Sequence, residues 1–297
     1  MTNWGGPVLQ RQSIHEELPD CSVQPEVVPA EATLVSLRAT TPLFGAGLIE
    51  AITEANILAR ADPDDRNGDG ISGRTNFVFN PETGHNEIGR FGWKAHISTL
   101  HHFAGDAYLN EMGITSPSFP QENLPQGQPI PDGCDLIPET NGQVEDADGK
   151  DVAAFTDYMR FLAPPAPRAL NTRTSHGAKT FMAIGCANCH VPTLFTGDNP
   201  VAALRFKRVN LYSDLLLHNM GPDLEDGMEM GSAKGDEWRT TPLWGLSNRL
   251  FFLHDGRTSN LEEAILAHGG EAERAHDRYL RLKPFERRAL IRFLKSL

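Results

Sequence analysis

The most constraining feature of this sequence is the pentapeptide Cys186-Ala187-Asn188-Cys189-His190. Two cysteines separated by two residues and followed by histidine form the attachment motif of c-type haem. On one helical turn, each thiol can form a thioether with a haem vinyl group, and the next residue can present its imidazole to the iron. A zinc half-site or a thioredoxin-like redox pair fits less well, because the other cysteines lie far away and residues 175–184 read as helix, not strand. The motif therefore predicts one covalent haem c held by Cys186, Cys189 and His190.

The second axial ligand decides whether the iron is closed for electron transfer or open to a substrate. Leu261, Ile265 and His268 fall at i, i+4 and i+7, which places His268 on the apolar face of a short helix that we expect to end at Gly269. A histidine on such a face is often only a core residue, but a haem must lie in this part of the chain. On spacing alone we favour His268 over rivals that stay open, namely Met220, Met228, Met230, His218 and His254.

A proline-rich connector at residues 163–168 divides the chain. Apolar residues recur at helical spacing over 155–162, and no helix continues through the three prolines that follow. We therefore expect an N-terminal lobe over residues 1–168 and a C-terminal haem domain over residues 169–297.

The second lobe contains the parts of a small cytochrome c. One helix leads into the haem motif, and a closing helix runs from Pro284 to Leu297 with one apolar face. We expect the two helices to pack on each other through Gly177 and Phe181. The expected fold class is mainly α: a cytochrome c-like domain with long ordered loops, beside an incomplete cytochrome c-like N-terminal lobe.

Charge and hydropathy narrow the range of partners. The 27 Lys and Arg residues against 39 Asp and Glu residues give a formal net charge of −12, so the chain lacks the basic face that nucleic-acid binding requires. No apolar run approaches the roughly 18 residues of a membrane span. The acidic charge suits a basic redox partner protein or a small electron donor.

The predicted cofactor also indicates a compartment. Because haem c is attached outside the cytoplasm, we expect a periplasmic or otherwise extracytoplasmic protein. The first residues, Met1 to Pro7, have neither the basic start nor the apolar stretch of a secretory signal. The sequence thus suggests a processed chain, a trimmed chain or a fragment. In an oxidising compartment Cys21 and Cys134 either form a disulfide, which we favour slightly, or stay isolated thiols.

The segment from Asp65 to Asn76 begins like a calcium-binding loop. Asp65, Asn67 and Asp69 provide oxygens at positions 1, 3 and 5, a glycine follows at position 6, and Ile71 offers its carbonyl at position 7. Position 12 is Asn76 instead of the usual bidentate glutamate, so a cation must recruit Asn76 itself, water, or neighbours such as Asp62 and Asp64. The alternative is an Asx-rich turn without metal. We favour calcium, with a role in fixing the loop.

Three segments of the C-terminal part resemble the bacterial di-haem oxidoreductase family, a branch of the di-haem cytochrome c peroxidase superfamily. They span residues 237–246, 252–257 and 261–272, and the likeness extends over nearly the whole chain. In the peroxidases the segment after the His-Asp-Gly turn carries the distal ligand of the electron-transfer haem, and that position is His268 here. The resemblance therefore implies a bis-histidine iron with His190, a closed, low-spin, low-potential centre, and Arg239 among the cofactor-binding residues.

The N-terminal lobe resembles the same family in two shorter segments. Residues 89–95 are similar to the peroxidases' tryptophan-containing segment, and residues 110–113 to their Glu-Met-Gly, so Glu111 inherits by analogy the role of general acid and base at a peroxidatic haem. The family's first Cys-x-x-Cys-His is absent, because neither Cys21 nor Cys134 belongs to such a motif. Without that haem, Glu111 has no peroxidatic centre at which to act. The alternative interpretation is a carboxylate at the end of a helix, without a catalytic role.

Three functions stay open. In the first, the chain is an extracytoplasmic haem c protein that relays electrons to or from a peroxidatic centre. In the second, it is a mono-haem electron-transfer subunit whose second haem is lost, or is supplied by a partner chain or a missing segment. In the third, it is a truncated family member without peroxidase activity. Whether it is itself an enzyme is left undecided, because this sequence does not encode the open haem. Electron transfer through one bound haem is the function that the residues support best.

Overall fold

The structure is a computed structural model that describes residues 6–14, 17–18, 20–131, 133–135 and 143–297. The prediction about the chain start, including Met1, thus lies outside the described residues. The α-helices are α1 (Ala46–Ala51), α2 (Glu54–Leu58), α3 (Leu100–Met112), α4 (Lys150–Phe161), α5 (Thr172–Ile184), α6 (Leu261–Leu266), α7 (Glu273–Leu280) and α8 (Pro284–Leu294). Short 3₁₀ helices are η3 (Pro125–Gly127), η5 (Cys186–Asn188), η6 (Pro222–Leu224), η7 (Leu246–Asn248) and η8 (Gly270–Ala272).

The strands form small two-stranded sheets between the helices. β1 (Phe77–Asn80) pairs with β2 (His85–Ile88), β3 (Leu194–Phe195) with β4 (Arg208–Val209), and β5 (Leu217–Asn219) with β6 (Glu237–Arg239). The last two pairs are antiparallel. Helices account for only 32% of the structure and strands for 10%, so the expected mainly α class is wrong. The physical reason is that strands of two to four residues are too short to show alternation in the sequence.

The chain divides into two compact units that are each discontinuous in sequence. Unit 1 comprises Met1–Thr33, Asn80–His85 and Leu100–Tyr158. Unit 2 comprises Leu34–Phe79, Asn86–Thr99 and Met159–Leu297. The division of the sequence into lobes at residue 168 stays a prediction.

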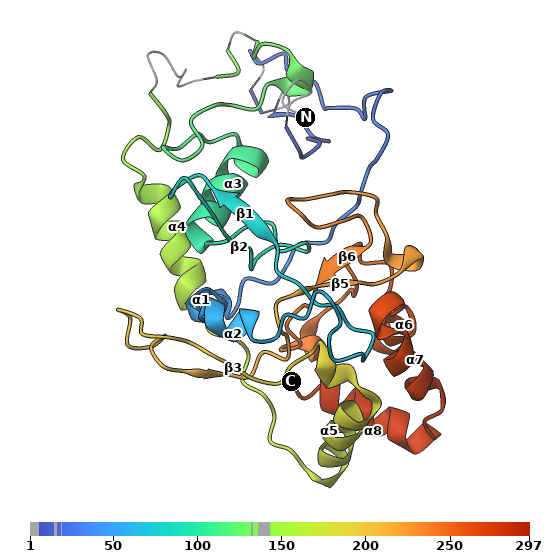
Figure 1. The fold of residues 1–297 in the computed structure, drawn as a ribbon. Helices are drawn as coiled ribbons and strands as arrows, with labels where there is room; N and C mark the ends of the chain where they lie inside the picture. Colours follow the sequence, from blue (N-terminus) through green and yellow to red (C-terminus); the bar gives the residue numbers. More distant parts are fainter. Residues whose placement is uncertain (1–5, 15–16, 19, 132, 136–142) are drawn as a thin grey trace. The chain divides into compact units, whose positions relative to one another are not determined.

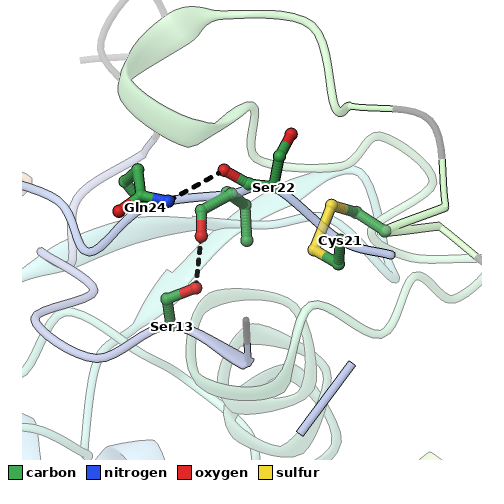
Figure 2. The surroundings of a disulfide bond; sticks show 6 residues. Ser13, Cys21, Ser22 and Gln24 are labelled. Atoms are coloured by element: carbon green, nitrogen blue, oxygen red, sulfur yellow. Dashed lines mark hydrogen bonds between the residues drawn. A yellow bond between two sulfur atoms is a disulfide. The ribbon is translucent and has the colours of Figure 1, made fainter. Parts of the chain in front are cut away.

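Unit 1 contains a disulfide between Cys21 and Cys134, which are 113 residues apart in the sequence. Figure 2 shows the bond beside the segment that carries Ser22 and Gln24, in which the Gln24 amide donates a 3.1 Å hydrogen bond to the Ser22 carbonyl. The pairing favoured from the sequence is therefore present. It closes a long loop and so restricts the unfolded ensemble of this unit.

In unit 2 the helices α5 and α8 lie side by side (Figure 1). Gly177 of α5 allows the close approach, because a Cβ built on it would lie 2.1 Å from the Ala289 carbonyl oxygen of α8. Next to it, the rings of Phe181 and Phe293 meet edge to face with centroids 5.6 Å apart. The predicted packing of the opening and closing helices through Gly177 and Phe181 is confirmed.

A single hydrophobic cluster joins α5 and α8 to α6 and α7. Its buried members come from all four helices and from the segment 246–252: Phe181, Ile184, Leu246, Phe252, Leu261, Ala264, Tyr279, Leu290, Phe293 and Leu294. In the described part of the chain no helix is long and apolar enough to cross a membrane.

Candidate functional site

The end of α5 places the two cysteines of the haem motif. Asn171 caps the start of the helix and forms a capping box with Thr174. Gly185 caps its end in the left-handed conformation, with φ of 97°. The chain then turns through η5, and the His190 amide donates a 2.9 Å hydrogen bond to the Cys186 carbonyl. Cys186 and Cys189 are free and half-buried. Burial raises the pKa of the Cys186 thiol to about 12 and also raises that of Cys189.

The rings of His190 and His268 lie near each other, with centroids 6.5 Å apart and planes inclined by 48°. Each ring is oriented by a backbone carbonyl: His190 Nδ1 lies 2.9 Å from the Tyr212 oxygen, and His268 Nδ1 lies 2.7 Å from the Ala264 oxygen. A carbonyl can only accept, so Nδ1 carries the proton and Nε2 keeps its lone pair. This is the arrangement of a metal-binding imidazole with a fixed tautomer.

Both imidazoles are neutral at pH 7. Burial, followed by the neighbouring His268, lowers the pKa of His190 to about 4, and burial also lowers the pKa of His268. The two side chains are enclosed by protein atoms on most sides. They remain partly accessible to solvent because they line a cavity. A neutral imidazole is the form that binds a metal.

The cavity between these groups has a volume of about 280 Å³, and its lining residues all belong to unit 2. Ligand pockets typically start near 300 Å³, so this cavity has about the size of the smaller ones. Both cysteines and both histidines line it. Its apolar wall is formed by the hydrophobic cluster, including Phe181, Ile184, Leu246, Phe252, Leu261 and Leu290.

Two arginines supply positive charge to the same cavity. Arg239 Nε donates a 2.8 Å hydrogen bond to the Gly92 carbonyl, and Arg249 Nη2 donates a 3.2 Å bond to the Pro242 carbonyl. Burial lowers the pKa of each to about 10, and their mutual repulsion adds to the effect on Arg239. Within the described residues neither guanidinium forms a salt bridge, and the buried Arg249 Nε has no hydrogen-bond partner. A buried and a half-buried cation without a carboxylate partner fit an anionic ligand.

The rival axial ligands have other surroundings. Met220 lines the cavity, whereas Met228 and Met230 are not among its lining residues. The Met230 sulfur accepts a 2.7 Å hydrogen bond from Arg38. His254 also lines the cavity but stacks on Trp238 at 3.9 Å. His218 lies between two carboxylates. Of these candidates, His268 has its ring opposite His190.

The predicted calcium-binding loop, residues 65–76, is called the acidic loop from here on. It lies at the cavity, since Asp69 and Ile71 are among the lining residues. Its side-chain oxygens accept backbone bonds typical of Asx turns: Asp65 from Gly70, Asn67 from Asp69, and Asp69 from Ile71. The structure describes no group of three or more His, Cys, Asp or Glu side chains able to hold a metal ion. Calcium binding by this loop stays a prediction.

Asn76, the last residue of the predicted calcium loop, has separate partners. It is fully buried, and its Oδ1 accepts hydrogen bonds of 2.9 Å from the Ser232 amide and 3.0 Å from the Ser232 hydroxyl. Its Nδ2 donates to the carbonyls of Lys94 and Met230. The structure therefore does not bring the Asn76 side chain together with Asp65, Asn67 and Asp69.

Glu111 is exposed near the end of α3 in unit 1, and it is not among the residues that line the cavity. Sequence reasoning missed two contributors that are close to the haem motif: Arg249, and the pair of carboxylates beside His218. Asp214 precedes His218 by four residues, but this spacing predicts a side-chain contact only in a helix, and the segment is not helical. Glu271 is 53 residues away from His218. No local pattern could have indicated these partners.

Comparison with known proteins gives a family for nearly the whole chain. A family model described as "Di-haem oxidoreductase, putative peroxidase" matches residues 16–297. Among solved structures, the chain is similar to a MauG-like protein associated with microbial copper homeostasis, with 15% identity and a TM-score of 0.42 over 91% of this chain and 95% of that one. It is also similar to the hydrazine synthase of Kuenenia stuttgartiensis, with 16% identity and a TM-score of 0.42 over 92% and 100%. No curated protein matches the sequence.

Proposed function

The chain belongs to the di-haem oxidoreductase family and is thus a haem-dependent oxidoreductase, and from this premise we propose that it transfers electrons through one covalent haem c. Cys186 and Cys189 would carry the thioether bonds, and His190 and His268 would bind the iron. The resemblance stated from the sequence and the geometry of the cavity both support this assignment.

The observation that carries the proposal is the pair of opposed imidazoles. The ring centroids are 6.5 Å apart, and a metal ion bound by both imidazoles would take about 4 Å of this distance at metal–nitrogen distances of about 2 Å each. The separation therefore suits one metal ion bound by both histidines.

Arg239 and Arg249 provide the positive charge that a bound haem would require for its carboxylates. A bound haem carries two propionates, and each buried guanidinium can pair with a carboxylate. We assign the propionates to this side of the cavity. Pairing gives the buried Arg249 Nε an acceptor and removes the repulsion between the two cations.

The ligand set defines the kind of redox chemistry. A bound haem c supplies an iron that changes its charge by one electron. His190 and His268 would both bind this iron, and two protein ligands favour electron transfer over substrate chemistry there. Their fixed Nδ1 hydrogen bonds hold the rings in place in both oxidation states.

The disulfide supports a location outside the cytoplasm, because such bonds persist in oxidising compartments. The redox partner is proposed to be a basic protein or a small electron donor, since the chain carries a net charge of −12. A second haem, on a partner chain or a further segment, is the proposed site of any peroxidase reaction. Glu111 has no part in the haem site proposed here.

The test is the amount of covalent haem per chain, measured by pyridine haemochrome on protein from a host with a c-type haem maturation system. We expect one haem per wild-type chain and none in the Cys186→Ala/Cys189→Ala variant. The Cys21→Ser/Cys134→Ser variant is the matched control, because it also removes two cysteines but keeps its haem. A wild-type chain without covalent haem would contradict the proposal.

A further inference from the structure

A buried histidine that is not a proposed iron ligand lies beside the haem motif. His218 belongs to β5, and its Nε2 is 2.9 Å from Asp214 Oδ2 while its Nδ1 is 2.7 Å from Glu271 Oε2. The side chain of His218 is 3% exposed, and those of Asp214 and Glu271 are 2% and 10% exposed. Bulk water therefore screens these three groups only weakly.

The geometry requires that His218 is an imidazolium. A carboxylate only accepts hydrogen bonds, so both ring nitrogens satisfy their partners only when both carry a proton. Burial alone lowers the pKa of His218, but the bonds to Asp214, Cys189 and Glu271 outweigh burial and raise the pKa well above its usual value. At neutral pH the cluster thus contains one cation and two anions.

The cluster is attached to the haem motif at two points. His218 Nδ1 lies 3.6 Å from the sulfur of Cys189, and the Asp214 amide donates a 3.0 Å hydrogen bond to the Cys189 carbonyl. His218 and Glu271 line the cavity itself. On the other side of the ring only glycine fits at position 73, because a Cβ there would lie 2.5 Å from His218 Cε1.

Glu271 is in turn held by two other segments. Its carboxylate accepts hydrogen bonds of 3.0 and 2.9 Å from the amide and hydroxyl of Ser72, and one of 3.1 Å from the Asn219 amide. The carboxylate is therefore fixed relative to β5 and to the acidic loop. The titratable and charged groups that face the cluster are Cys189, His190 and Arg239. The pKa of His190 depends in part on Asp214 and His218, and Asp214 raises the pKa of Arg239 against the effect of burial.

We propose that Asp214, His218 and Glu271 form a positioning cluster that fixes the Cys189 thioether and holds the haem at a low reduction potential. The inference rests on the proposed covalent haem. Reduction removes one positive charge from the iron, so a buried cluster with a surplus anion at the edge of the haem disfavours it. Removing one of the two anions should therefore raise the potential.

The experiment compares Glu271→Gln and Asp214→Asn with wild-type protein by spectroelectrochemical titration at pH 7. Asp198→Asn is the control, because it removes the same charge from an exposed side chain that does not line the cavity. We expect each cluster variant to shift the ratio of reduced to oxidised haem about tenfold at a fixed potential, which equals about 59 mV for a one-electron couple. The control should not shift it.

Haem content separates this inference from the proposed function. If wild-type protein has no covalent haem, the proposed function fails. If the variants contain haem but titrate like Asp198→Asn, the positioning cluster is refuted.

Nitrogen NMR of the histidines in ferrous wild-type protein keeps the test decisive if neither variant folds. One imidazole that stays doubly protonated at pH 8 supports the cluster, whereas neutral tautomers for all histidines at that pH overturn it.

Discussion

Asp106 of α3 offers a prediction about the stability of unit 1. The pKa of its carboxyl is raised to about 6, first by burial and then by the neighbouring Glu111. In the variant Asp106→Asn, the side-chain oxygen can still accept the 3.0 Å hydrogen bond from Asn110 Nδ2. The substitution thus removes the buried charge and keeps the bond. We expect it to stabilise the folded protein at neutral pH.

The magnitude follows from the difference between the native pKa of about 6 and the ordinary value of 3.8. Each pH unit between these two values corresponds to about 1.4 kcal/mol of unfolding free energy. The charged carboxylate therefore costs about 3 kcal/mol at pH 7, about 1.6 kcal/mol at pH 5 and about 0.6 kcal/mol at pH 4. Native Asp106 binds its proton more tightly than the unfolded chain does. The advantage of the variant over wild type should thus shrink as the pH falls.

The assay is urea unfolding at pH 7, 5 and 4, with hydrogen exchange of the α3 amides to report on unit 1. Glu111→Gln should act in the same direction but less, because it removes only the second cause of the raised pKa. Asp148→Asn is the control from the same unit, since the pKa of this exposed carboxyl is lowered by Lys150. An effect of Asp106→Asn that is equally large at pH 4 and pH 7 would refute the reasoning.

Three further predictions concern the iron, the disulfide and the acidic loop. His268→Ala should give a high-spin haem that binds added imidazole or cyanide much faster than wild type, and an unchanged low-spin spectrum would instead favour Met220, which also lines the cavity. Removing the Cys21–Cys134 bond should lower the unfolding free energy of unit 1 by up to about 5 kcal/mol, because it opens a loop of 113 residues, and an unchanged urea midpoint would contradict this. Calcium should bind the loop only weakly, with a dissociation constant of about 10⁻⁴ to 10⁻³ M, because Asn76 is held by Ser232, and calorimetry of metal-free protein without any heat of binding would exclude the site.

Sequence patterns predicted those parts of the site that depend on interactions between residues close together in the chain. The Cys186 to His190 spacing, the helix over residues 175–184 and the closing helix at Pro284 all depend on residues within a few positions of one another. Gly177 and Phe181 could be matched to that closing helix because apolar faces and small residues mark helix contacts. His268 was expected on the apolar face of a helix that ends at Gly269. In the structure α6 ends at Leu266, so the turn after the helix, in which the His268 amide donates to the Ile265 carbonyl, places the ring near His190.

The remaining features depend on contacts between distant segments. Short strands such as β5 and β6 exist because they pair with each other, so their sequences alone favour no strand. Asn76 looked like a calcium ligand from its position in the loop, yet its amide joins Lys94 and Ser232. His218 was considered only as an iron ligand, because its second carboxylate partner, Glu271, is 53 residues away.

The proposed ligand set also determines where the chemistry of this family can occur. If His190 and His268 both bind the iron, no substrate reaches it, and the electron must pass to or from another redox centre. This sequence contains one Cys-x-x-Cys-His motif, so that centre is not a second haem c attached in the same way to these residues. A haem on a partner protein, or on a further segment outside this sequence, would exchange that electron. Fast electron exchange then requires a docking surface of complementary charge, and the net charge of −12 makes a basic partner the physically favoured choice.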